Sequence, residues 1–181
     1  MCTSPEEPRA LVIYESMFLN TEKVAEAIVR GLRDAGWAAS DVDVRWAPST
    51  FDGVDLVILG APTHAFSLSR PSTRADALRQ GAAPGRVDRG LREWLAGLPP
   101  AGDPAPVVAV FDTRVSKVRR LPASAARTIA KLVRRRGLRL VGRPTGFLVE
   151  DVAGPLCSGE LDRAMEWGRD LTNALGLRRF A

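Results

Sequence analysis

Apolar side chains along the chain alternate between continuous runs and helical stripes, which is typical of an α/β protein. The first run, residues 10–14, has no alternation of polar and apolar positions, as expected for a central parallel strand covered on both faces. A helical stripe follows, with apolar positions at spacings of three and four. These positions are Val24, Ala25, Ile28, Leu32 and Ala35. Residues 52–60 and 107–111 contain two further apolar runs and predict two more central strands.

Weaker patterns predict the remaining elements. In residues 38–47, Val42, Val44 and Trp46 alternate with charged residues, which indicates a half-exposed edge strand. A last strand, or a pair of strands, is expected in residues 138–149 and is broken at residues 142–146. Helices are predicted at residues 91–98, from Pro122 to Gly137, and from the capping Ser158 to about Leu175, with a further helical stretch near Thr73.

This order of elements predicts an α/β fold in three layers, a doubly wound parallel sheet of five strands between helices. With 181 residues the chain fits a single domain, residues 1–181, of which we expect residues 1–8 to form a flexible tail. Trp94 and Trp167 lie at helical spacing with other apolar residues, so we expect both to pack in the core.

Composition argues against several classes of protein. A hydrophobic content of 45% argues against disorder, and no apolar run approaches the roughly 18 residues that span a membrane. The polar N-terminus lacks the features of a secretion signal, so we expect a cytoplasmic protein. His64 is the sole histidine, and Cys2 and Cys157 are the only cysteines. We therefore expect neither a metal site nor a disulfide.

Positive charge is concentrated in one part of the chain. Residues 114–149 contain eleven Lys or Arg and no Asp or Glu, whereas the rest carries 15 basic and 21 acidic residues. Such asymmetry favours an anionic partner. The alternative is a solvated face in a protein whose abundant Arg and Ala are typical of a GC-rich genome. Interleaved aromatic residues and a nucleic-acid-binding motif are both missing, so nucleic acid is the less favoured partner.

The carboxyl ends of the predicted strands are where an open parallel sheet binds its ligand. Three loops leave those ends, at residues 15–21, 61–74 and 112–123. The first is rich in hydroxyl and amide groups and contains no Lys or Arg, which is typical of a site that holds phosphate through backbone N–H groups. It has neither the GxxxxGK[ST] nor the GxGxxG pattern, so nucleoside triphosphate and dinucleotide sites of those types are disfavoured.

Four short motifs, in this order, resemble the flavodoxin family. They are Ser16-Met17-Phe18-Leu19-Asn20-Thr21, Gly60-Ala61-Pro62-Thr63-His64, Phe111-Asp112-Thr113-Arg114, and Gly154-Pro155-Leu156 followed by Gly159-Glu160, Arg163-Ala164 and Trp167. The resemblance covers about residues 9–175. It implies a flavodoxin-like sheet with strand order 2-1-3-4-5.

The resemblance also implies FMN at the carboxyl edge of the sheet and a role in electron transfer, as a carrier or as a small FMN-dependent reductase that oxidises NAD(P)H. It places the phosphate on the loop that contains Ser16, Met17, Phe18, Leu19, Asn20 and Thr21. It places the isoalloxazine between a second loop with Pro62, Thr63, His64 and Phe66 and a third with Asp112, Thr113 and Arg114. No side chain is assigned a catalytic role, because the flavin supplies the redox chemistry.

Two departures from the family pattern support an alternative, a flavodoxin-fold binding module that has lost FMN. The family usually has Gly at the position of Leu19, and Gly permits a backbone conformation or a close approach that a Leu side chain disfavours. Flavodoxins also commonly enclose the ring between large aromatic side chains. Here the second loop offers only His64 and Phe66, and the third offers none.

Each candidate side chain also has a structural interpretation. Ser16 and Thr21 bind phosphate or cap the first helix, and capping is favoured for Thr21. Thr63 and Thr113 bind the flavin edge or shape turns. His64 is an exposed loop residue, or it faces the flavin and donates a proton. Phe66 stacks on the flavin or anchors its loop.

The basic segment, residues 114–143, is the expected contact for a redox partner protein or for NAD(P)H. Arg114, Lys117, Arg119 and Arg120 are expected beside the pyrimidine edge of the flavin. If FMN binds, their charge would stabilise the anionic reduced flavin and raise its potential.

Overall fold

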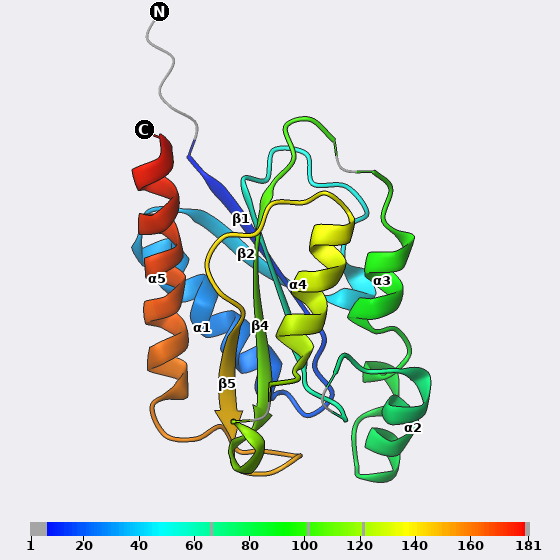
Figure 1. Ribbon diagram of the computed structural model, residues 1–181. Helices are drawn as coiled ribbons and strands as arrows, with labels where there is room; N and C mark the ends of the chain where they lie inside the picture. The colour runs from blue at the N-terminus through cyan, green and yellow to red at the C-terminus, as the bar shows by residue number, and fades with distance from the viewer. Residues whose placement is uncertain (1–6, 66, 101, 121, 180–181) are drawn as a thin grey trace, which may run out of the picture.

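A computed structural model describes residues 7–65, 67–100, 102–120 and 122–179. It contains one parallel five-stranded sheet with the order β2-β1-β3-β4-β5 and helices on both faces, as the sequence predicts (Figure 1). The strands are β1 (Arg9–Tyr14), β2 (Ala38–Asp43), β3 (Leu56–Pro62), β4 (Val107–Val115) and β5 (Thr145–Val149). The α-helices are α1 (Asn20–Asp34), α2 (Pro71–Arg79), α3 (Leu91–Gly97), α4 (Ala125–Arg135) and α5 (Glu160–Arg179).

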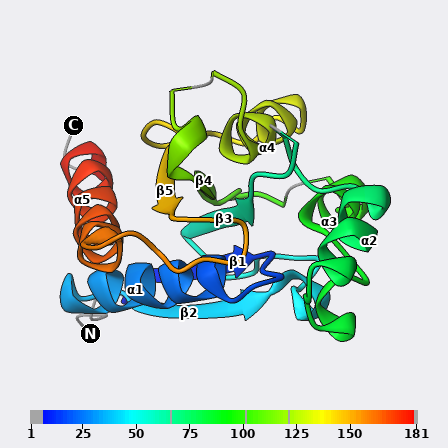
Figure 2. The same cartoon turned by 90° about the horizontal axis from the view of Figure 1, so that it is seen from below.

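The helices form two layers, with α1 and α5 on one face of the sheet and α3 and α4 on the other (Figure 2). Trp94 of α3 is buried in the core, as predicted. Its indole N–H donates to the Pro48 carbonyl at 3.1 Å. Trp167 is half-buried and packs edge-on against Phe111 and Phe147. In the described part of the chain, no helix is long and apolar enough to cross a membrane.

The backbones of α1 and α5 lie in direct contact. An added Cβ at Gly31 would lie 2.0 Å from the Met165 carbonyl oxygen, and one at Gly168 would lie 2.6 Å from the Ile28 carbonyl oxygen. Since two glycines face the partner backbone in this way, the two helices pack closer than side chains would allow.

Several predicted strand boundaries are wrong. The run at residues 52–60 begins with a turn, so β3 starts at Leu56 and continues to Pro62. The edge strand predicted at residues 38–47 ends at Asp43, because the Asp43 carboxylate accepts the Arg45 N–H and turns the chain into a short 3₁₀ helix. Trp46 is consequently 76% exposed instead of lying on an inner face. Only the second half of residues 138–149 forms a strand; Leu140 makes an isolated bridge to Val108.

The loops and helix starts near the carboxyl edge also differ from prediction. Asp112, Thr113 and Arg114 belong to β4, which pairs with β5 as far as Val115. The loop predicted at residues 61–74 is shorter, because β3 extends into it and α2 begins at Pro71. Helix α4 begins at Ala125, capped by the Ser124 hydroxyl, and not at Pro122. Helix α5 begins at Glu160 and continues to Arg179, beyond the predicted end.

Candidate functional site

A cavity of about 260 Å³ opens at the carboxyl edge of the sheet. Of the predicted site residues, its walls contain Ser16, Met17, Phe18, Asn20, Thr21, Pro62, Thr63, His64, Thr113 and Arg114. Ala65, Val115, Val149 and Val152 also line it. Leu19 and Asp112 lie outside the lining, and Phe66 lies outside the described residues. The structure therefore brings residues from all three predicted loops to one cavity.

The first loop presents a series of backbone N–H groups at the start of α1. Within the described part of the chain, the N–H groups of residues 17–21 donate no hydrogen bond. Leu19 precedes the helix with a left-handed backbone, φ 67°, between its neighbours. A run of N–H groups around such a residue forms a concave anion-binding arrangement. The helix N-terminus adds its partial positive charge to it.

Leu19 takes up a left-handed backbone conformation, which Gly adopts more readily than Leu. The Leu19 side chain is 43% exposed and lies outside the cavity lining. Its left-handed backbone costs about 1–2 kcal/mol of strain. A Leu side chain disfavours this loop conformation, as expected, but does not prevent it.

The polar side chains of the first loop form hydrogen bonds with different parts of the chain. Ser16 Oγ accepts the Glu22 N–H at 3.2 Å and so caps α1. Thr21 Oγ1 lies 2.8 Å from Thr113 Oγ1 in a buried hydrogen bond. The favoured prediction for Thr21, that it caps the helix, is wrong: its hydroxyl joins α1 to β4. Asn20 donates from Nδ2 to the Ala153 carbonyl and ties the loop after β5 to the same place.

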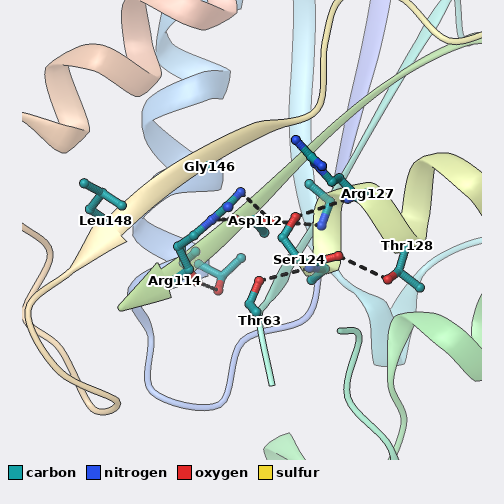
Figure 3. A network of polar contacts seen from close by, with 12 residues as sticks. Thr63, Asp112, Arg114, Ser124, Arg127, Thr128, Gly146 and Leu148 are labelled. Carbon is teal, nitrogen blue, oxygen red and sulfur yellow. Dashed lines mark hydrogen bonds and ion pairs between the residues drawn. The ribbon is translucent and has the colours of Figure 1, made fainter. Parts of the chain in front are cut away.

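The fully buried Asp112 carboxylate joins β4 to α4 beneath the cavity (Figure 3). It accepts two hydrogen bonds from Arg114, at 2.8 and 3.0 Å, and one from the Ala126 N–H at 2.9 Å. Thr63 Oγ1 accepts the neighbouring Ala125 N–H at 3.0 Å. Because Asp112 compensates Arg114, that guanidinium adds little net positive charge to the cavity wall.

A fourth wall comes from α2, of which the sequence placed only the first residues near the site, in the loop predicted at residues 61–74. Thr73, Asp76, Ala77 and Gln80 line the cavity from one face of α2. Ala77 and Ala82 form a buried apolar cluster with Met17 of the first loop. The helical stretch near Thr73 was visible in the sequence, but its packing over the first loop depends on tertiary contacts.

His64 lies in the turn after β3, in the cavity wall. Burial, with a smaller contribution from the Arg74 guanidinium, lowers the pKa of His64 below its ordinary value of 6.5. The imidazole is therefore neutral at pH 7. Among the described residues, Nε2 has no hydrogen-bond partner. The side chain is not the exposed loop histidine of the first interpretation.

A buried polar network holds the segment around α2 and α3 against the first loop. Glu15, 1% exposed, accepts the Leu91 N–H at 2.8 Å. Arg74, 4% exposed, contacts the Ser69 hydroxyl and the Glu93 carboxylate. Burial raises the pKa of Glu15, and this effect exceeds the opposing influence of Ser69, Leu91 and Arg74.

We expect the free energy of unfolding of Glu15→Gln, measured relative to that of the parent protein, to increase with pH. The native pKa of Glu15 lies above the unfolded value near 4.5, so the folded state binds the proton more tightly. The parent protein therefore loses stability as pH rises from about 4.5 through the native pKa, and the Gln variant lacks this loss. Urea unfolding between pH 4 and 8 measures the difference, with the exposed Glu26→Gln as control. A difference that does not change with pH would contradict the prediction.

No sequence model of a protein family matches the chain. Solved structures, however, match nearly all of it. A flavodoxin from the domain Archaea superposes with a TM-score of 0.61 and 17% identity, covering 91% of this chain and 96% of the other. Oxidised flavodoxin 2 from Bacillus cereus gives 0.64 and 18%, covering 91% and 98%.

The flavodiiron protein from Giardia intestinalis gives a TM-score of 0.58 and 18% identity, covering 92% of this chain but only 36% of that protein. These likenesses show that the fold is flavodoxin-like. The cavity lies at the sheet edge where doubly wound folds place their ligands.

Proposed function

We propose that the protein binds FMN in the cavity at the carboxyl edge and acts in electron transfer. The observation that carries this proposal is the run of backbone N–H groups at residues 17–21, which have no acceptor among the described residues. Such groups at the start of a 15-residue helix suit a phosphate without requiring a Lys or Arg. The flavodoxins among the similar structures support the same function.

The residues present fit both ends of FMN. The first loop and the Ser16 hydroxyl would hold the phosphate, while residues 62–65 and 113–115 would lie on either side of the ring. Pro62, Val115, Val149 and Val152 supply apolar surface. The cavity is slightly smaller than the ~300–1,000 Å³ usual for ligand sites, so part of the cofactor would lie at the open mouth. FMN supplies one- and two-electron chemistry when bound.

Two roles in electron transfer are consistent with this site. A carrier exchanges electrons with a redox partner protein, whereas a small reductase oxidises NAD(P)H itself. The neutral His64 offers an N–H donor or a nitrogen acceptor to a ligand in the cavity. With Arg114 compensated by Asp112, the positive charge available to a reduced flavin would come from the exposed Lys117, Arg119 and Arg120. Mixing the FMN-loaded protein with NADPH in a stopped-flow spectrometer separates the roles.

The visible spectrum of the purified protein, repeated after adding FMN and removing the excess, tests the proposal. Flavin bands retained through filtration would support it. A colourless protein that also fails to quench FMN fluorescence would instead favour the alternative, a binding module without cofactor.

We expect Leu19→Asp to weaken FMN binding about tenfold relative to Leu19→Asn, because a carboxylate in the first loop repels the phosphate. Asn and Asp both tolerate the left-handed backbone of Leu19. The two variants thus differ in one charge and not in loop geometry. Riboflavin, which lacks the phosphate, should bind both variants equally. Fluorescence titrations with FMN and riboflavin measure the four affinities, and equal affinities for FMN would place the phosphate elsewhere.

A further inference from the structure

A second hollow, of about 390 Å³, lies between α3 and the outer face of α4. We call it the basic hollow, because Arg92, Arg127, Lys131 and Arg135 line it together with Thr128 and Leu132. No carboxylate is among its lining residues. Ser124 also lies in its wall. The N–H of the next residue, Ala125, donates a hydrogen bond to Thr63 Oγ1, which lies in the wall of the first cavity (Figure 3). The first residue of α4 therefore connects the wall of the basic hollow to the wall of the first cavity.

The four cations of the basic hollow lack a carboxylate counterion among the described residues. None of them forms an ion pair with a carboxylate in the part of the chain that the structure describes. Arg92 is held by neutral acceptors only, namely Ser67 Oγ and the carbonyl groups of Leu68 and Ser69. Among the described residues, seven Arg side chains pair with Asp or Glu, whereas others such as Arg134 and Arg139 do not. What distinguishes the basic hollow is that four unpaired cations line one concavity.

This arrangement costs the isolated protein stability. Arg127, Lys131 and Arg135 follow one another at intervals of four residues, so they lie on one face of α4 and repel each other. They span about 12 Å along the helix axis. The first N–H groups of α4 are already bonded to Thr63, Asp112 and Ser124, so attraction for an anion comes from the side chains and not from the helix end.

We propose that the basic hollow binds the clustered phosphates of a nucleotide. The cations surround one concavity of the size usual for small ligands, about 300–1,000 Å³, and do not form the extended track that a nucleic acid requires. The half-buried Leu132 side chain supplies an apolar surface for the base. An acidic protein surface would need a wider contact than this hollow offers. The proposal does not depend on FMN in the first cavity.

Isothermal titration calorimetry of the full chain with ATP, NADPH, NADH and pyrophosphate tests the proposal. We expect at least one nucleotide to bind more tightly than pyrophosphate. Arg127→Gln/Lys131→Gln/Arg135→Gln should weaken that binding about tenfold, since three exposed charge contacts are lost. The matched control is Arg134→Gln/Arg139→Gln/Arg143→Gln, which removes the same charge from exposed positions outside the hollow.

Preference for NADPH would identify a pyridine nucleotide, and preference for ATP a nucleoside polyphosphate. An equal loss of nucleotide affinity in the two triple variants would show that binding depends only on overall charge, and would overturn the proposal. Absence of nucleotide binding, or tighter binding of poly-L-glutamate than of any nucleotide, would also overturn it; the latter would indicate an acidic protein partner. FMN binding measured by fluorescence should be equal in the two triple variants, so the tests of the two cavities are distinguishable.

Discussion

Asp112→Ala is expected to lower the free energy of unfolding by about 3–5 kcal/mol, the range for breaking a buried charge pair. The substitution removes the two hydrogen bonds to Arg114 and the one to the Ala126 N–H. Arg114 is then left partly buried without its counterion, and the first turn of α4 loses an acceptor. Both losses are large because Asp112 is fully buried.

Asp76→Ala is the matched control for Asp112→Ala. Asp76 also pairs with an Arg, Arg79, but both side chains are at least half exposed, so its removal should cost less than about 1 kcal/mol. Urea unfolding followed by far-UV circular dichroism measures both variants. Equal destabilisation of the two would show that burial of Asp112 contributes nothing.

Gly31→Ala is expected to lower the free energy of unfolding by about 2–3 kcal/mol. Its Cβ would lie 2.0 Å from the Met165 carbonyl oxygen, and a backbone atom of α5 cannot move aside as a flexible side chain can. Overpacking usually costs roughly 1–3 kcal/mol, and a clash this short with a backbone atom exceeds the usual range, at about 3–4 kcal/mol. The better helix propensity of Ala returns about 1 kcal/mol of this cost.

The control for Gly31→Ala is Gly97→Ala. Gly97 is also helical, but nothing lies within 4 Å of an added Cβ there. Without a clash, the propensity gain should leave the stability unchanged or raise it by up to about 1 kcal/mol. Thermal and urea unfolding compare the two variants. Stabilisation of the protein by Gly31→Ala would mean that α1 and α5 do not pack as closely as described.

The sequence determined the sheet and the place of the site. Continuous apolar runs identified β1, β3 and β4, because a strand covered on both faces tolerates no polar alternation. The order of strands and helices then placed three loops at one edge. Ten of the thirteen predicted site residues line the cavity there. Their roles toward FMN remain predictions.

Only the tertiary structure decided how polar residues are used. Asp112 looks like the end of a strand in the sequence, but Arg114 and α4 supply partners that allow β4 to continue. Leu19 adopts a backbone that local preference opposes, because the surrounding loop holds it there.

The walls contributed by α2 and the grouping of Arg92 with the cations of α4 depend on contacts between residues far apart in the chain. Periodicity records which face of an element is apolar. It does not record which other element covers that face or faces its polar side, so these features required the assembled fold.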